Sequence, residues 1–169
     1  MVYWHCFAIR RIRIAEKKSL MDSTDRKILM ELQRSRQNTK EVATKVGLSV
    51  TPTYERIKKL EQQGFIKGYV ALLDREKIGK RVVAYCQVTL VKHQKDLINR
   101  FEQEIRTLPE IMECHHVSGN FDFLLKVAVD DIPAFHQFIN EKLSVIEGIS
   151  NIHSAFVMNS VKETTHYAL

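Results

Sequence analysis

Apolar residues recur at helical spacing in the first part of the chain and predict three short helices. The first follows the stretch 22–25, Asp-Ser-Thr-Asp, whose side chains can cap a helix N-terminus. The second fits residues 39–46, with Thr39 as its cap and Gly47 at its end, and the third fits residues 49–63. Three short helices, with a glycine in the turn between the second and the third, match a helix-turn-helix.

The third helix predicts a face that is free to meet another molecule. If Ile57 marks the centre of the buried side, Val50, Tyr54 and Leu60 lie within about 60° of it. The residues that then point outward or lie on the flanks are Thr51, Pro52, Glu55, Arg56, Lys58 and Lys59.

Small polar groups at the start of this helix suit contact with nucleic acid. Ser49, Thr51 and the unpaired N–H groups of the first turn can bond phosphate. Arg56 can contact phosphate or a guanine edge, and Glu55 can accept from a cytosine amino group. For one amphipathic helix, the alternative is a solvated basic helix in a small bundle.

The sequence after the third helix predicts a small ribbon and then a linker. Residues 65–73 are rich in β-forming side chains and suit a hairpin or wing, which gives a winged helix-turn-helix over residues 21–73. Residues 74–81 are charged, contain a glycine and are expected to link this domain to residues 82–169.

The remainder of the chain predicts a second domain of alternating elements. Strands are expected at 82–91, 111–118, 121–129 and 149–158, and helices at 95–108 and from Pro133 to about residue 146. Gly119-Asn120 is expected to form a tight turn between the middle strands. The order β-α-β-β-α-β predicts a ferredoxin-like domain, so the fold class is α+β.

The strand at 82–91 is apolar on both faces apart from Gln87 and Thr89. One face can pack on the two helices, whereas the other leaves Val83 and Tyr85 in water unless something covers them. A second copy of the sheet is the simplest cover, which predicts an isologous homodimer.

The turn at residues 118–122 combines glycine, a side-chain amide and a carboxylate. Its backbone N–H groups could hold an α-carboxylate, and Asp122 could pair with an α-ammonium group. The alternative is an ordinary hairpin with a solvated aspartate.

The run Cys114-His115-His116 raises the question of a metal site. Only Cys114 and His116 can share a strand face, and two ligands without a CxxC or HxxxH spacing do not make a structural zinc site. We therefore expect no metal and no cofactor, and we interpret Cys86 and Cys114 as core residues.

Composition and charge narrow the class of protein. Apolar residues make up 44% of the 169, which is ordinary for a globular chain. No window approaches about 18 uninterrupted apolar residues, so no membrane span is expected. Three cysteines do not suggest a disulfide framework and fit a reducing compartment such as the cytoplasm. The net charge of the chain is +6. Residues 1–21 and 22–71 each carry +4 and residues 72–169 carry −2, which indicates a polyanion-binding part in the N-terminal half.

Residues 1–20 differ from the rest, since an apolar run precedes the basic cluster of Arg10, Arg11 and Arg13. This order is the reverse of a secretory signal. One interpretation is that translation starts at Met21 and the segment is an upstream or disordered extension. A basic arm that touches DNA phosphates and a transit peptide are the alternatives.

Two stretches carry a resemblance to a known family, VATKVGLSVTPTYERIKKLEQQGFIKGYVALL and ECHHVSGNFDFLLKV. Both are similar to the Lrp/AsnC family of feast/famine regulators, and the resemblance covers about residues 22–162. It implies double-stranded DNA as a partner, a small amino acid as effector, and homodimers assembled into octamers or similar discs.

Residue by residue, the resemblance places Ser49, Thr51, Pro52 and Arg56 on the recognition helix, and Gly119, Phe121 and Asp122 on the effector-site turn. The sequence departs from related chains at Val50 and Tyr54, and at His116, Ile152 and Ala155, which bear on the identity of the effector. The full set of candidate DNA contacts is Thr39, Lys40, Ser49, Thr51, Pro52, Thr53, Arg56 and Lys59. The candidate effector contacts are His116, Ser118, Gly119, Asn120, Phe121, Asp122, Ser154 and Phe156.

The predicted function is therefore a DNA-binding transcriptional regulator modulated by an amino acid. An enzyme subunit with a regulatory domain is a rival, but the sequence holds no nucleophile–base pair, P-loop or GxGxxG in support. A pure oligomerisation protein without a ligand is a second rival.

Overall fold

The computed structural model of the chain describes residues 21–34 and 38–169, so the interpretations of residues 1–20 lie outside the described part. The chain divides into two compact units, one reaching to Ala71 and including Glu163–Leu169, the other Leu72–Lys162. The sequence had assigned residues 163–169 to the second domain. Within the described residues, no helix is long and apolar enough to cross a membrane.

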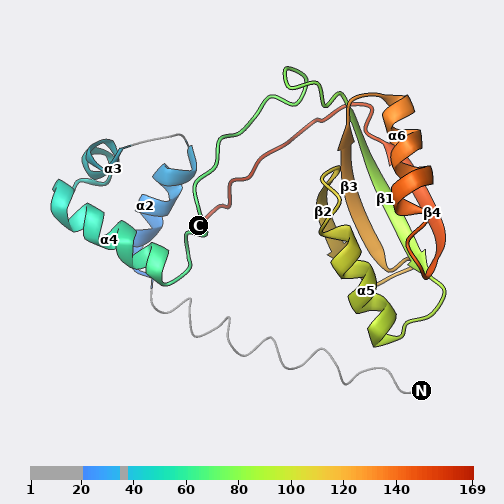
Figure 1. Cartoon of the computed structure of the whole chain (residues 1–169). Helices are drawn as coiled ribbons and strands as arrows, with labels where there is room; N and C mark the ends of the chain where they lie inside the picture. Colours follow the sequence, from blue (N-terminus) through green and yellow to red (C-terminus); the bar gives the residue numbers. More distant parts are fainter. Residues whose placement is uncertain (1–20, 35–37) are drawn as a thin grey trace. The chain divides into compact units, whose positions relative to one another are not determined.

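The described part of the first unit contains the helices α2 (Ser23–Arg34), α3 (Thr39–Val46) and α4 (Val50–Gln62) (Figure 1). Their shared core holds one buried residue or more from each helix: Ile28, Val42, Ile57 and Leu60. This arrangement confirms the predicted helix-turn-helix.

Side-chain caps define where α2 and α3 begin. Asp22 Oδ1 accepts the N–H of Asp25 at 2.7 Å at the start of α2. Asn38, not Thr39, caps α3, because its Oδ1 accepts the N–H of Glu41 at 2.9 Å. Gly47 closes α3 with φ of 75°, a left-handed conformation that glycine adopts without a steric penalty.

The prediction for the buried face of α4 was wrong in part. Thr53, Ile57 and Leu60 are buried, whereas Val50 and Tyr54 are 46% and 49% exposed. The buried sector is thus centred on the side of Thr53 rather than on Ile57, since the helix turns that side toward its neighbours. A helical wheel gives the width of a face but cannot orient it without the neighbours.

The ribbon expected at 65–73 is not formed within the described chain. Phe65 and Ile66 pack against the core of the helices, but no strand is assigned between them and residue 82. Tyr69 connects this extended segment to α4, because its hydroxyl donates to Glu61 Oε1 at 2.9 Å. Partial desolvation of the hydroxyl, together with this hydrogen bond, raises the pKa of Tyr69 to about 12.

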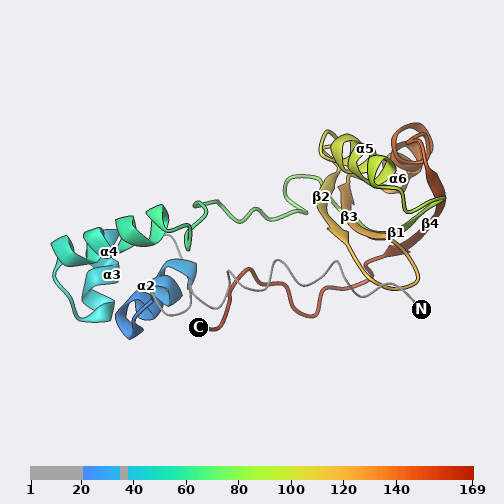
Figure 2. The same ribbon diagram turned by 90° about the horizontal axis from the view of Figure 1, so that it is seen from below.

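The second unit has the predicted ferredoxin-like order. Its elements are β1 (Val82–Leu90), α5 (Lys95–Ile105), β2 (Ile111–His116), β3 (Phe123–Val129), α6 (Ile132–Phe138) and β4 (Ile149–Phe156). The strands form one antiparallel sheet in the order β2-β3-β1-β4. Figure 2 shows α5 and α6 on one face of this curved sheet, with the opposite face uncovered by helices.

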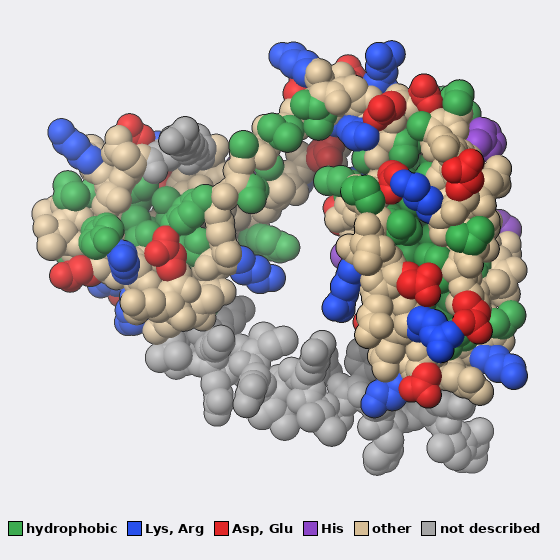
Figure 3. Space-filling view, in the orientation of Figure 1, with side chains coloured by type: hydrophobic (Ala, Val, Ile, Leu, Met, Phe, Trp, Pro, Cys, Tyr) green, Lys and Arg blue, Asp and Glu red, His purple; other side chains and the backbone are tan. Residues whose placement is uncertain are grey.

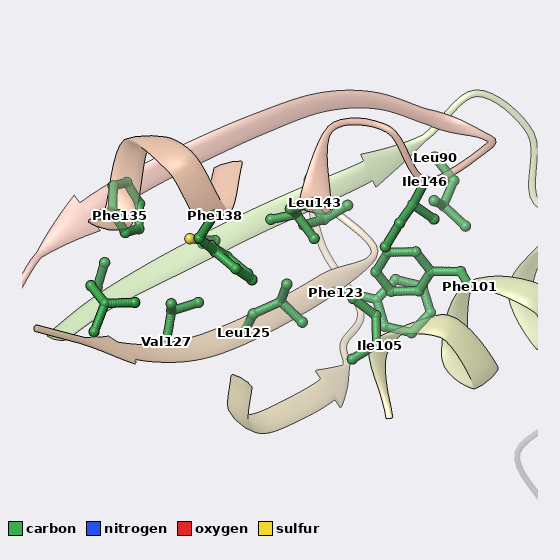
Figure 4. Close-up of a cluster of buried hydrophobic side chains, with 14 residues drawn as sticks. Leu90, Phe101, Ile105, Phe123, Leu125, Val127, Phe135, Phe138, Leu143 and Ile146 are labelled. Atoms are coloured by element: carbon green, nitrogen blue, oxygen red, sulfur yellow. The ribbon is translucent and has the colours of Figure 1, made fainter. Parts of the chain in front are cut away.

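The core of the second unit lies between the sheet and its helices (Figure 4). Alternate residues of β1 and β3 point into it, as the period of two in a strand requires. The rings of Phe101 on α5 and Phe123 on β3 meet with centroids 4.5 Å apart. This contact joins α5 to the first residue of β3.

Two local expectations were wrong. After α6 the chain continues as a π-helical turn, Ile139–Leu143, which a sequence pattern of period 3.6 does not distinguish. The connection between β2 and β3 is six residues long, 117–122, instead of a two-residue turn at Gly119-Asn120. The longer connection carries the candidate effector residues.

The open face of the sheet is only partly as predicted. Tyr85 is 39% exposed there, but Val83 is already buried in the single chain. Exposed His153 and His115 flank Gln87 and Leu124 at the same level of the sheet. The face is therefore mixed in polarity rather than apolar throughout.

Candidate functional site

The connection 117–122 brings backbone donors together at the end of the β2–β3 hairpin. Its ends are held by two hydrogen bonds of 2.9 Å, from Val117 N–H to Asp122 O and from Asp122 N–H to Val88 O. Gly119 has φ of 146°, a conformation open mainly to glycine. No group among the described residues accepts a hydrogen bond from the N–H groups of residues 118–121, so they are available to an anion.

Asp122 is the buried polar residue at this end of the sheet. Its Oδ2 accepts the N–H of Leu90 at 2.7 Å, and its Oδ1 lies 3.1 Å from His93 Nδ1. The side chain is 10% exposed. The carboxylate thus holds β1 against β3, in contrast to the free or solvated group that the sequence suggested.

Ser118, Gly119 and Asn120 are exposed on the turn, and Phe121 is half-buried. His116, just before the turn, stacks on Phe123 with ring centroids 4.7 Å apart. Both residues line a cavity of about 390 Å³ between α5 and β2.

Ser154 and Phe156 do not join the turn within one chain. They pair with Cys86 and Ala84 on β1, while the turn bonds to Val88. Along β1, Ala84 lies about 13 Å and Cys86 about 7 Å from Val88, and β4 pairs with the edge of β1 opposite to β3. Ser154 donates to Cys86 Sγ at 3.4 Å, and Phe156 packs edge-on against Phe135, so both belong to the helix-covered side.

The cysteine and histidine run has the geometry that the strand period predicts. Cys114 and His116 pair with Leu125 and Phe123 and so share one face. Among the described residues, no cluster of three or more His, Cys, Asp or Glu could hold a metal ion. Burial raises the pKa of the Cys114 thiol to about 11, which disfavours the thiolate that binds metals.

The first unit presents several predicted DNA-contact residues to solvent. Lys40, Ser49, Thr51 and Lys59 are exposed. Ser49 occupies the N-cap position of α4 without a side-chain cap bond, which leaves its hydroxyl available. Figure 3 shows Lys and Arg side chains spread over the visible face of this unit, with hydrophobic side chains between them.

Three of the predicted DNA-contact residues are less accessible to DNA. Thr39 and Pro52 are half-buried. Thr53 is fully buried, and its hydroxyl donates to the carbonyl of Ser49 at 2.9 Å. The prediction of a DNA contact through the Thr53 side chain is therefore wrong, because that side chain belongs to the packed face of α4.

Arg56 is directed toward α2 rather than outward. Its Nη1 lies 2.6 Å from Asp22 Oδ2 and 2.7 Å from Asp25 Oδ1. Asp25 is buried, so this pair neutralises a carboxylate that has little access to water. A guanidinium held by two aspartates positions α4 on α2, and it reaches DNA only if it leaves both of them.

Tyr54 was missed as a surface residue of α4, whereas Lys58 was expected on the flank of that helix. The ammonium of Lys58 lies 5.4 Å from the centroid of the Tyr54 ring, in a cation–π contact. Both side chains are exposed, as is Val50. Choosing Ile57 as the centre of the buried face placed Val50 and Tyr54 on the wrong side of the helix.

Comparison with known families assigns both units. A family model described as winged helix-turn-helix DNA-binding matches residues 21–67, and one described as the Lrp/AsnC ligand binding domain matches residues 83–167. The chain belongs to the Lrp/AsnC family of transcriptional regulators. It is thus a DNA-binding transcriptional regulator with an amino-acid-binding domain, and it is not an enzyme.

Relatives of this Lrp/AsnC regulator match over nearly their whole length. The leucine-responsive regulatory proteins of Klebsiella pneumoniae and Escherichia coli K12 are each 38% identical over 150 residues, covering 88% of this chain and 92% of theirs. A transcriptional regulator from Neisseria meningitidis, solved in complex with L-methionine, is 33% identical with a TM-score of 0.84, over 88% of this chain and 96% of its own. An AsnC family regulator from Agrobacterium tumefaciens is 38% identical with a TM-score of 0.83, over 88% and 97%.

The ion pair of Arg56 predicts a pH-dependent contribution to stability. Hydrogen bonds from the Asp25 N–H and from Arg56 hold the pKa of Asp22 below its ordinary 3.8. A lowered pKa stabilises the folded state above about pH 3.8 and loses that effect as the pH falls further. Arg56→Ala should lower the free energy of unfolding by about 1–3 kcal/mol at pH 6, because the buried Asp25 loses a charged donor. The difference from wild type should shrink below pH 3.8.

Chemical unfolding followed by far-ultraviolet circular dichroism measures this effect. Arg26→Ala is the matched control, since Arg26 is an exposed arginine on α2, next to Asp25. Equal stability of Arg56→Ala and Arg26→Ala at pH 6 would contradict the assigned role.

Proposed function

We propose that the turn 118–122 is the effector site and that it binds the backbone of an α-amino acid. The observation that carries this proposal is that the free N–H groups of residues 118–121 directly precede the carboxylate of Asp122 in the same turn. The N–H groups would hold the α-carboxylate. Asp122 Oδ1 would hold the α-ammonium, while Oδ2 stays bonded to Leu90 N–H.

The effector that we propose is an apolar L-amino acid such as methionine or leucine. The complex of the Neisseria relative with L-methionine supports this class, as do the leucine-responsive relatives. The cavity beside His116 is lined by Phe123, Ile105 and Ile111 as well as polar groups, and it offers an apolar side chain a place next to the turn. Ser154 and Phe156 would take part only through another copy of the chain.

For DNA, we infer that the N-terminus and exposed face of α4 enter the major groove. Ser49, Thr51 and the first-turn N–H groups would bond phosphate, with Lys40 and Lys59 beside them. Val50 would offer an apolar contact to thymine methyl groups, and the Tyr54–Lys58 pair would face the groove.

We also propose that the regulator acts in the cytoplasm as a homodimer built on the open face of the sheet. Exposed Tyr85 at the centre of that face supports a second copy as its cover. Assembly into octamers or similar discs is part of the same proposal.

The effector proposal predicts a selective rise in melting temperature. Ligands that bind only the native state stabilise it by RT ln(1 + [L]/Kd), so about 2.7 kcal/mol is expected at 100 times Kd. L-Methionine or L-leucine should stabilise the full chain. N-Acetyl-L-methionine lacks the ammonium and L-methionine amide lacks the carboxylate, so neither should. Equal stabilisation by the analogues, or none by any of the twenty amino acids, would refute the assignment.

The DNA proposal predicts the salt dependence of binding. Lys59→Gln should weaken binding about equally across DNA sequences and reduce the slope of log K against log [salt] by about one, as for a lost phosphate contact. Lys95→Gln, an exposed lysine at the start of α5, is the control with the same charge change. Fluorescence anisotropy with a labelled duplex measures both variants. Identical slopes for Lys59→Gln and wild type would remove Lys59 from the interface.

A further inference from the structure

His93 covers the one oxygen of Asp122 that a ligand could reach. Its Nδ1 lies 3.1 Å from Oδ1, whereas Oδ2 is bonded to the buried N–H of Leu90. Among the described residues, no other side chain forms a hydrogen bond or an ion pair with Oδ1. An ammonium group that pairs with Oδ1 therefore competes with the imidazole for that oxygen.

The two sides of this contact differ in freedom. Asp122 is anchored by its backbone N–H to Val88 O, by its carbonyl to Val117 N–H and by Oδ2 to Leu90 N–H. His93 is 72% exposed, lies between β1 and α5, and has the Asp122 carboxylate as its partner. The imidazole can thus rotate into solvent without breaking any bond of the sheet, while Asp122 cannot move without breaking several.

We propose that His93 is a gate of the effector site, which occupies Asp122 Oδ1 in the unliganded regulator and is displaced by the ammonium of the amino acid. This inference rests on the proposed effector site. The displaced contact lowers the apparent affinity for the effector, so His93 sets the concentration at which the regulator responds. An exposed pair of this kind is worth about 0.4–1 kcal/mol, which corresponds to a factor of about two to five in Kd.

Three single variants test the gate by isothermal titration of L-methionine and L-leucine into the full chain. His93→Ala removes the imidazole from Asp122 Oδ1, and this variant should bind the amino acid two- to fivefold more tightly than wild type. His93→Lys places a tethered ammonium at Oδ1 and should bind at least tenfold more weakly. Lys92→Ala removes an exposed cation from the same loop and should bind as wild type does, which separates the specific contact from general charge.

The outcomes distinguish the gate from the site. Unchanged or weaker binding by His93→Ala, while wild type binds, would overturn the gate and leave the effector site standing. Binding by His93→Ala where wild type shows none would support the gate. If neither wild type nor any variant binds any of the twenty amino acids, the effector site fails and the gate fails with it.

Discussion

The end of the regulator's central strand pair depends on one buried carboxylate. Asp122 accepts the N–H of Leu90 at the point where β1 and β3 cease to pair, and its backbone continues the ladder through Val88 O. A buried N–H without an acceptor costs about 1–3 kcal/mol, so the strand end, the turn and Asp122 are coupled energetically. The same bonds set the position of the N–H groups that follow Gly119. A residue needed by the fold thereby places one carboxylate oxygen beside the N–H groups of the proposed effector site.

The DNA-binding unit uses charge in a similar way. Arg56 joins Asp22 and Asp25 at the start of α2 and fixes the direction of α4. The groups left exposed at the start of α4 are small and polar, and the basic side chains stand around them. In both units, then, a partly buried charged side chain, Asp122 or Arg56, holds an element that has exposed backbone N–H groups. These N–H groups are the ones suited to bind the proposed amino acid or DNA phosphate.

Much of this architecture is readable from the sequence because it depends on local periodicity. The helix bounds, the Gly47 turn and the four strands follow from spacing and from glycine chemistry, and the structure agrees within a few residues. Features that depend on neighbours were not readable. Nothing local shows that α4 buries Thr53 instead of Tyr54, or that Arg56 reaches residues more than thirty positions earlier.

The effector turn shows the same limit. Its residue types suggested an anion site, but the burial of Asp122 and its bond to Leu90 require the pairing of β1 with β3. The family resemblance assigns Ser154 and Phe156 to the same site as the turn. The register of β4 pairs them with Cys86 and Ala84, whereas the turn is bonded to Val88. No strand forms at 65–73, because these strand-forming residues have no pairing partner among the described residues.

The central claim is that an amino acid at the Asp122 turn and DNA at α4 influence each other's binding. Linkage requires the influence to be reciprocal, with a typical coupling of about 1–3 kcal/mol. The direct measurement is calorimetric titration of L-methionine and L-leucine into the full-length regulator, alone and saturated with a duplex selected by the protein in vitro. We expect DNA to change the Kd of the amino acid about 5- to 150-fold, and the amino acid to change the Kd of DNA by the same factor. Amino acid binding with the same Kd in the presence and absence of DNA would contradict it.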